Sequence, residues 1–177
     1  MKKFLLTLSM TALLLFTAGC SCPFSDKTAD SKSQMSTAKA SSAEVAPDFS
    51  YKELGSGKTM RLSDLKGKPV FINFWATWCP PCVGELPHIE KKYAEYKDKM
   101  HFVILSVDDN EQDPARFIQS KGYTFPAAYG DHQELGRAYG IDAIPASYII
   151  SADGHIVARI VGSMNESSLD AFLQKAF

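Results

Sequence analysis

The stretch Val70-Phe71-Ile72-Asn73-Phe74-Trp75-Ala76-Thr77-Trp78-Cys79-Pro80-Pro81-Cys82 joins an apolar run to two cysteines that are three positions apart. A continuous apolar run of this length is typical of a strand that is buried on both faces of a sheet. Residues three apart lie on one face of a helix, so a helix that starts at the cysteines lets them form one disulfide. Unpaired N–H groups and the positive end of that helix stabilise a Cys79 thiolate, the form that attacks disulfides. The stretch therefore predicts a redox-active disulfide between Cys79 and Cys82.

The composition allows one folded core and argues against nucleic acid as a partner. The 177 residues are 45% hydrophobic and carry a formal net charge of −1, so the chain has no excess of positive charge for a phosphate backbone. The run of Asp108, Asn110 and Asp113 lacks the glycine and the terminal glutamate of a calcium-binding loop. The histidines show no zinc-ligand spacing with the cysteine pair; they are His88, His101, His132 and His155. We therefore expect no metal and no cofactor.

The N-terminus predicts export. Met1-Lys2-Lys3 is a charged start, and the apolar segment 4–16 is shorter than the roughly 20 apolar residues of a membrane span. The small residues 17–19 then precede Cys20, which resembles a bacterial lipobox, where the cysteine is lipidated and becomes the first mature residue. Thr17 departs from that motif, which usually has Leu there. We interpret residues 1–19 as a signal peptide of the lipoprotein type; the alternative is ordinary signal cleavage that releases an unanchored product.

We interpret residues 20–46 as a disordered tether that begins with the lipidated Cys20. The segment is rich in Ser, Ala, Thr and Lys, with Phe24 as its only aromatic residue, so it cannot bury enough apolar surface to offset its ordering entropy. Flexible-chain scaling gives it a reach of about 25 to 30 Å. Cys22 has no assigned role, and it can pair with Cys20 only if Cys20 is not lipidated.

Residues 47–177 alternate apolar runs with turn residues and predict one folded domain. We expect strands at 49–54, 59–62, 70–75, 102–107, 146–150 and 156–161. We expect helices after the cysteine pair and at 113–121, 132–139 and 166–177, with Asp113 as the N-cap of the second helix. The first two strands are predicted to form one β-hairpin, and the last two strands another. The sum is an α/β fold: a central mixed β-sheet with a parallel centre and an antiparallel edge, flanked by helices.

The helix after the cysteine pair suggests different roles for the two thiols. Its apolar stripe consists of Cys82, Leu86, Ile89, Tyr93, Tyr96 and Met100. Pro87 falls inside this helix and is expected to kink it. Because Cys79 precedes the helix whereas Cys82 begins the buried stripe, we expect Cys79 to attack a partner disulfide and Cys82 to resolve the mixed disulfide. A purely structural disulfide is the alternative, but so small a loop stabilises a fold little.

The order of these elements resembles the thioredoxin fold, and it is closely similar to the exported, membrane-tethered TlpA/ResA-like branch of that family. The motifs that carry the resemblance are Phe74 to Cys82, Glu85-Leu86-Pro87, Thr124-Phe125-Pro126, Ala138-Tyr139-Gly140-Ile141 and Ile144-Pro145. A CxxC pair joined to a late Ile-Pro is a specific combination. The resemblance covers Pro47 to the C-terminus, and it implies an N-terminal β-hairpin and an insertion after the central parallel strand.

The resemblance also implies which residues support the cysteines. In that family the proline that matches Pro145 is cis and faces the disulfide. Because proline has no N–H, the Ile144 backbone is left free to pair with an extended substrate segment. Trp78 is expected to shield the cysteines and to offer an apolar contact surface. We expect the intervening Pro80 and Pro81 to tune the reduction potential.

Glu85 is the third expected catalytic residue. Thioredoxins carry Asp at the strand position of Asn73, and an Asn side chain cannot accept a proton. Glu85 lies one turn beyond Cys82 on the predicted helix, and the matching family position also carries Glu, so we expect it to transfer protons. The alternative is a first-turn acid that is favoured only by the helix dipole.

The function that the resemblance implies is an exported thiol-disulfide oxidoreductase that reduces disulfides of exported proteins. Apocytochrome c, during cytochrome c maturation, is a client in that branch, and electrons come from a membrane thiol donor of the CcdA/DsbD type. We expect a monomer, attached to the membrane through its lipid anchor and facing the periplasm or the outer side of the cytoplasmic membrane.

Two further interpretations remain open at this level. A thiol peroxidase of the peroxiredoxin type has Thr three residues before its reactive cysteine, whereas this chain has Ala76 there and Thr77 one step later. A Cu(I)-binding or delivery module is the non-enzymatic alternative, because soft thiolates suit Cu(I). No methionine or histidine lies near the cysteine pair in the sequence to complete such a site.

Overall fold

The structure, a computed structural model, describes residues 44–177, which lie in one compact unit. The predicted signal peptide at 1–19, the lipidated Cys20 and nearly all of the predicted tether lie outside the described residues. Contacts begin at Glu44, whose carbonyl accepts the Ile156 N–H at 2.8 Å, and Val45 forms a β-bridge with His155. Among residues 44–177, no helix is both long enough and apolar enough to span a membrane.

A seven-stranded mixed sheet forms the centre of the domain, in the order β2-β1-β5-β4-β3-β6-β7. Its strands are β1 Ser50–Glu53, β2 Thr59–Arg61, β3 Val70–Trp75, β4 His101–Ser106, β5 Ala127–Tyr129, β6 Ala146–Ile150 and β7 Ile156–Val161. The three central strands β3, β4 and β5 are parallel, and the other pairings are antiparallel. The parallel register of β3 and β4 runs from Val70 opposite His101 to Trp75 opposite Ser106. The predicted α/β class with a parallel centre and antiparallel edges is confirmed.

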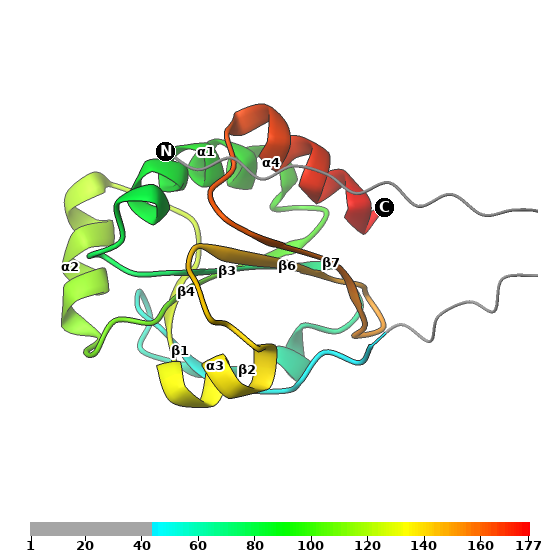
Figure 1. Ribbon diagram of the computed structural model, residues 1–177, viewed down its shortest axis with the longest axis horizontal. Helices are drawn as coiled ribbons and strands as arrows, with labels where there is room; N and C mark the ends of the chain where they lie inside the picture. The colour runs from blue at the N-terminus through cyan, green and yellow to red at the C-terminus, as the bar shows by residue number, and fades with distance from the viewer. Residues whose placement is uncertain (1–43) are drawn as a thin grey trace, which may run out of the picture. The chain divides into compact units, whose positions relative to one another are not determined.

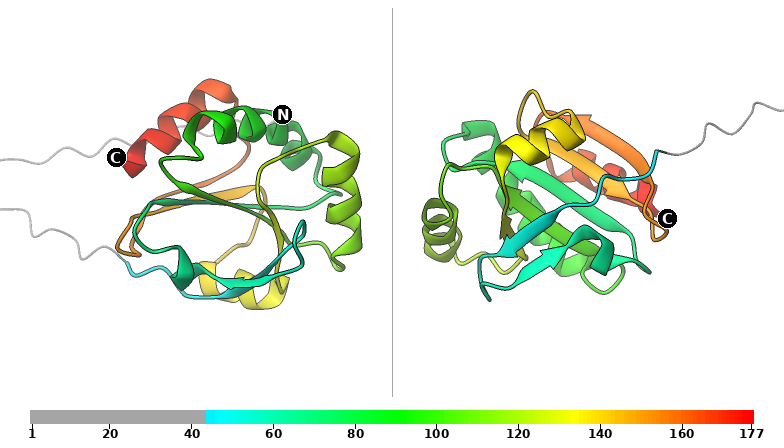
Figure 2. Two further views of the ribbon diagram at one scale, coloured as in Figure 1. Left: turned by 180° about the vertical axis from the view of Figure 1, so that it is seen from behind. Right: turned by 90° about the horizontal axis from the view of Figure 1, so that it is seen from below.

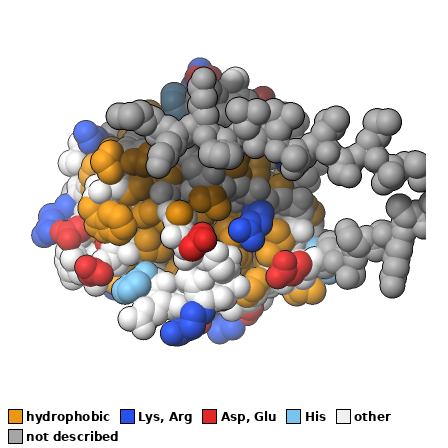
Figure 3. Space-filling view, in the orientation of Figure 1, with side chains coloured by type: hydrophobic (Ala, Val, Ile, Leu, Met, Phe, Trp, Pro, Cys, Tyr) orange, Lys and Arg blue, Asp and Glu red, His pale blue; other side chains and the backbone are white. Residues whose placement is uncertain are grey.

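Helices cover both faces of this sheet. They are α1 Pro80–Tyr96, α2 Gln112–Lys121, α3 His132–Tyr139 and α4 Glu166–Leu173, with short 3-10 helices η1 Leu62–Leu65 and η2 Gln174–Ala176. Figures 1 and 2 show α1 and α4 on one face of the sheet and α3 on the other. In the orientation of Figure 1, hydrophobic side chains gather near the middle of the visible face, with charged side chains around them (Figure 3).

The side chains of β3 alternate between the two layers, as in any strand. Phe71 and Trp75 belong to the hydrophobic cluster beneath α1 and α4, whereas Phe74 belongs to the cluster that contains Leu135 of α3. Asn73 is two residues from both Phe71 and Trp75, so its side chain is directed to the α1 side. A polar group is therefore placed inside the apolar layer beneath the helix that carries the cysteines.

The insertion implied by the resemblance consists of α2 and β5, which lie between β4 and α3. The strand β5 pairs with β4 on one side and with β1 on the other, so it joins the N-terminal hairpin to the rest of the sheet. No strand is predicted at these residues from the sequence. Three residues are too few for a periodic signal, and β5 is defined by pairing with strands that are distant in the sequence.

Three details of the predicted helices are corrected by the structure. The helix α2 begins at Gln112, so Asp113 is not its N-cap; Asn110 Oδ1 accepts the N–H groups of both residues at 3.1 Å instead. The helix α1 continues through Pro87 and ends at Tyr96, so Met100 lies beyond it although Met100 is buried. The last predicted helix is α-helical only to Leu173 and ends as the 3-10 helix η2.

Candidate active site

The cysteine pair lies at the junction between β3 and α1, and the two cysteines form a disulfide. The S–S distance is 2.03 Å and the two Cα atoms are 5.3 Å apart. Cys79 is the N-cap of α1, and its Sγ accepts the backbone N–H of Cys82 at 3.3 Å. Pro80 and Pro81 occupy the first helical turn, where a missing N–H leaves no helical hydrogen bond unmade. The predicted disulfide at a helix start is therefore present.

The two sulfurs differ less in exposure than the sequence pattern suggested. Cys79 is 5% exposed and Cys82 is 1% exposed, so both are buried in this oxidised state. Trp78, directly before them, is 65% exposed, whereas Trp75 is fully buried in the core. What distinguishes the cysteines is position: Cys79 caps the helix and lies next to the loop before β6, while Cys82 lies one turn inside.

That loop contains Ile144 and Pro145, and the peptide bond between them is cis, as the resemblance implied. The carbonyl oxygen of Ile144 is 3.8 Å from Cys79 Sγ, although 65 residues separate them in the sequence. When the cysteines are reduced, the Cys79 thiol can donate a hydrogen bond to this carbonyl. The fold thus brings together Cys79, Ile144 and Pro145 from two distant segments.

Glu85 is buried on the inner side of α1, with 1% of its surface exposed. Its Oε1 accepts the backbone N–H of Met164 at 3.2 Å, while Oε2 has no hydrogen-bond partner among the described residues. Burial raises the pKa of Glu85 to about 7, and the Met164 N–H and the Asn73 side chain oppose that shift. A carboxyl group in this setting is poised between its neutral and charged forms near neutral pH.

Asn73 provides the polar neighbour of Glu85 in the apolar layer. It is 1% exposed, and its Nδ2 donates to Ser147 Oγ of β6 at 3.0 Å. Its Oδ1 has no partner among the described residues. Two buried acceptor atoms, Asn73 Oδ1 and Glu85 Oε2, are therefore unsatisfied, which is costly unless a proton or a water molecule supplies a donor.

From the sequence, Asp108 is considered only within the rejected calcium-binding run, so its place near the cysteines is missed; it follows β4 and is 2% exposed. Its carboxylate accepts the Thr77 N–H at 3.1 Å, the Thr77 hydroxyl at 2.6 Å and the Ser106 hydroxyl at 2.7 Å. These bonds hold the loop directly before Trp78 and Cys79. A signal was available, because functional side chains in α/β proteins gather at the carboxyl ends of parallel strands, and Asp108 follows the end of β4.

A groove of about 270 Å³ opens beside the cysteine pair. It is lined by Trp78, Val107, Asp109, His132, Gly136, Ile141, Asp142, Ala143 and Ile144. Its walls therefore come from the loop before Cys79, the end of β4, the helix α3 and the loop before β6. Within residues 44–177 there is no cluster of three His, Cys, Asp or Glu side chains that could hold a metal ion.

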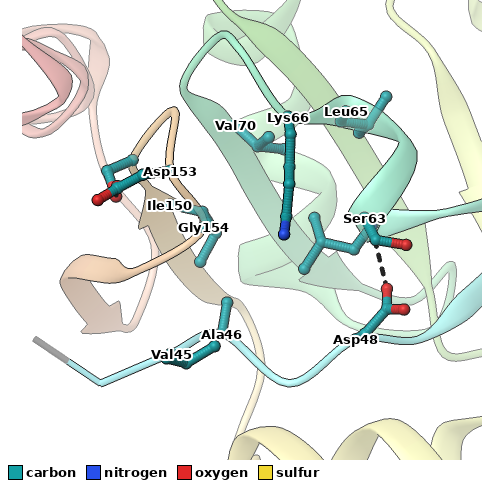
Figure 4. Close-up of a pocket in the computed structure, with 12 residues that line it drawn as sticks. Val45, Ala46, Asp48, Ser63, Leu65, Lys66, Val70, Ile150, Asp153 and Gly154 are labelled. Atoms are coloured by element: carbon teal, nitrogen blue, oxygen red, sulfur yellow. Dashed lines mark hydrogen bonds between the residues drawn. The ribbon is translucent and has the colours of Figure 1, made fainter.

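A second cavity, of about 220 Å³, lies at the other end of β3 (Figure 4). Val45, Ala46 and Val70 line it, and the Ser63 N–H donates to Asp48 Oδ1 at its edge at 3.0 Å. Because Val70 begins β3 and the cysteine pair follows the end of β3, roughly 17 Å of strand separates this cavity from the disulfide. None of the residues that surround the disulfide lines it.

Comparison with known proteins agrees with this geometry. The family model described as Redoxin matches residues 39–173. The chain is 37% identical over 131 residues to the thiol-disulfide oxidoreductase ResA of Bacillus thuringiensis strain Al Hakam, covering 73% of this chain and 75% of that protein. It is 34% identical over 174 residues to the ResA of Halalkalibacterium halodurans, covering 98% and 94% of the two chains.

A solved structure extends the likeness to the fold. The exposed lipoprotein thioredoxin Etrx1 of Streptococcus pneumoniae strain TIGR4 superposes with a TM-score of 0.64 at 27% sequence identity, covering 73% of this chain and 99% of that one. The family match, the sequence identity and the mixed sheet with CxxC at the start of α1 all agree. The chain therefore belongs to the redoxin family, and within it to the ResA-like, thioredoxin-fold thiol-disulfide oxidoreductases.

Proposed function

We propose that this oxidoreductase is exported, is held at a membrane by a lipid on Cys20, and reduces disulfides of other exported proteins. The observation that carries the redox part is the Cys79–Cys82 disulfide at the start of α1, with the Ile144 carbonyl oxygen 3.8 Å from Cys79 Sγ. A cysteine pair in this position exchanges two electrons with another disulfide through a mixed-disulfide intermediate.

In the reduced protein, the Cys79 thiolate attacks one sulfur of a client disulfide. The client's other sulfur leaves as a thiolate, and Cys79 is then joined to the client in a mixed disulfide. Cys82, once it has lost its proton, attacks Cys79 Sγ, so the internal disulfide forms and the client's second sulfur is released as a thiolate. Two electrons pass from the cysteine pair to the client, and both client thiolates take up protons.

Glu85 is the group that we assign to the proton of Cys82. Cys82 is 1% exposed, so solvent has poor access to it. Glu85 lies three residues further along α1, on the same side of the helix. Its pKa of about 7 lets it accept and return a proton at neutral pH with little energetic bias.

The surroundings of the disulfide suit an extended client segment. The backbone at Ile144 and Pro145 lies beside Cys79, and Trp78 offers a largely exposed indole for apolar contact. Pro80 and Pro81 stand between the two sulfurs in sequence, and we assign them the tuning of the reduction potential.

Export and anchoring rest on the sequence before the folded domain. The charged start, the short apolar segment and Cys20 after small residues form the pattern of a lipoprotein signal, and we propose that the segment after Cys20 tethers the domain to the membrane. The similar Streptococcus pneumoniae protein is itself described as an exposed lipoprotein. From the resemblance we further propose apocytochrome c as a client and a membrane thiol donor of the CcdA/DsbD type as the electron source.

Trapping and potentiometry test the proposal together. The reduced full chain is mixed with a disulfide-bonded peptide that carries a CxxCH haem-attachment sequence. We expect reduction of the peptide, accumulation of a mixed disulfide with Cys82→Ala, and no reaction with Cys79→Ser. Against glutathione we expect a reducing potential, toward the thioredoxin value of about −270 mV. A potential near that of the oxidant DsbA, about −120 mV, or the absence of a mixed disulfide, contradicts the proposal.

A further inference from the structure

The groove beside the disulfide has apolar walls and lies next to Cys79. Trp78, Val107, Ile141 and Ile144 give it apolar walls, and the Ile144 carbonyl oxygen is 3.8 Å from Cys79 Sγ, so the groove adjoins the attacking sulfur. A client whose disulfide is attacked at Cys79 can therefore place the residues next to that disulfide in this groove.

Two acidic residues, Asp109 and Asp142, line the same groove from different loops. Asp109 follows β4, Asp142 follows α3, and both side chains belong to exposed residues. In the described part of the chain neither carboxyl group accepts a hydrogen bond or forms an ion pair. The groove is lined by no lysine or arginine from residues 44–177.

Several other exposed acids of the domain differ in this respect. Asp48 pairs with Arg61 at 2.7 Å, Glu95 pairs with Lys92 at 2.7 Å, and Asp153 lies 3.1 Å from His155. The two acids of the groove, which His132 also lines, have no lysine or arginine partner among residues 44–177 and can meet a cation from outside the domain. The exposed indole of Trp78 adds a third feature that attracts cations, because the face of an indole ring carries negative electrostatic potential.

We propose that the groove binds the segment next to the client's disulfide and that Asp109 and Asp142 select clients with a lysine or arginine there. The inference rests on the proposed function and deepens it. The aliphatic part of the basic side chain lies along Trp78 and Ile144, and its charged end meets the two carboxylates. Exposed charges at the rim of an interface act mainly on the association rate. We therefore expect the preference for basic clients to appear in the rate of mixed-disulfide formation, and we expect added salt to weaken it.

The experiment uses three peptides with the same internal disulfide and with Lys, Gln or Glu on both sides of the cysteines. The second-order rate constant for their reduction by the reduced full chain is measured at low and at high salt. Each rate is divided by the rate with dithiothreitol, whose attacking thiolate is negatively charged like that of Cys79, which corrects for the effect of the flanking charge on attack by any thiolate. We expect the Lys peptide to react about tenfold faster than the Glu peptide at low salt, about threefold for each carboxylate.

The variants separate the groove from general charge effects. In the double variant Asp109→Asn, Asp142→Asn, the ratio of the corrected rates for the Lys and Glu peptides is expected to fall close to one. Each single variant is expected to give a ratio between those of the parent and the double variant. Asp98→Asn is the matched control, because Asp98 is exposed, follows α1 and does not line the groove; its ratio is expected to equal that of the parent. Thermal melting of the variants is expected to give midpoints close to that of the parent, because neither carboxyl group makes a hydrogen bond or an ion pair within residues 44–177.

The outcomes are distinguishable. Equal corrected rates for the three peptides, or a ratio that the double variant leaves unchanged, would overturn the selection by Asp109 and Asp142 while leaving the oxidoreductase function intact. Preference for the Glu peptide has the same consequence. Failure to reduce any of the peptides would overturn the proposed reductase and this inference together.

Discussion

The carboxylate of Glu85 on α1 accepts the backbone N–H of Met164, which lies 79 residues later, just before α4. This bond ties the helix that carries the cysteines to the segment that leads into the neighbouring helix. It also leaves Glu85 with a single hydrogen bond among the described residues, in an apolar layer, so burial dominates its protonation and raises its pKa to about 7. The same residue therefore ties α1 to the segment before α4 and carries a carboxyl group that can titrate near neutral pH.

Substitution of Glu85 by Gln is expected to change how stability depends on pH. Well below pH 4.5 the carboxyl is neutral in both the folded and the unfolded chain, so it does not affect the pH dependence there. Between pH 4.5 and about 7 the unfolded chain releases the proton more readily than the folded one, so folding loses stability as pH rises. At about 1.4 kcal/mol per pKa unit, the total loss is about 3.5 kcal/mol well above pH 7.

The measurement is urea unfolding of the oxidised protein and of Glu85→Gln at pH 4.5 and pH 8. The Gln side chain can still accept the Met164 N–H, so the comparison isolates the charge. We expect the variant's advantage in unfolding free energy to grow by about 3 kcal/mol between the two pH values. Parallel pH profiles for the two proteins would show that Glu85 is not titrating with a raised pKa.

The same substitution is expected to alter the resolving step. If Glu85 takes the proton of Cys82, the rate at which Cys82 displaces a client from Cys79 rises with pH through an inflection near 7 in the parent. In Glu85→Gln that inflection is expected to disappear, and the rate at neutral pH is expected to fall by about 10²-fold. Rapid-quench analysis of the mixed disulfide measures this rate; an unaltered pH profile removes Glu85 from proton transfer.

Asp108 is expected to stabilise the active-site loop through Thr77. Its buried carboxylate accepts both the N–H and the hydroxyl of Thr77, and hydrogen bonds to charged groups contribute about 1.5 to 3 kcal/mol each. Asp108→Ala is expected to destabilise the domain by about 3 kcal/mol and to slow reduction of a client peptide. A double-mutant cycle with Thr77→Val, read by urea unfolding, is expected to give a coupling energy of about 1 to 2 kcal/mol. Additive losses would mean that the two side chains act independently.

Cys82→Ser separates the oxidoreductase from the peroxidase interpretation. With Cys79 alone, the protein is expected to form a stable mixed disulfide with a client peptide and to show no catalytic consumption of hydrogen peroxide. Peroxide consumption is followed in the presence of dithiothreitol, with Cys79→Ser as the blank. Turnover of peroxide that survives Cys82→Ser would restore the peroxidase interpretation.

The sequence predicted the local elements well because their signals are local. The helix at His132–Tyr139 is bounded by Asp131, whose side chain accepts two N–H groups, and by Gly140 with a φ of 59°, and both signals are visible in the sequence. The late hairpin likewise follows from two apolar runs around Asp153-Gly154. Strand β5 lay beyond such reasoning, because pairing with distant strands defines it. The start of α2 was misplaced although its signal is local: Asn110 caps it, while Asp113-Pro114 offers a second N-cap pattern three residues later.

The sequence by itself determined the redox chemistry. Cys79 and Cys82 are three residues apart at the start of a helix, and helix geometry places residues three apart on one face, so the two sulfurs can form a disulfide. Only the tertiary structure decided what surrounds them. Ile144 reaches Cys79 across 65 residues, Met164 reaches Glu85 across 79, and Asp108 reaches Thr77 across 31. The physical reason is that periodicity and turn residues specify each element separately, whereas contacts between elements depend on how their apolar faces pack onto one sheet.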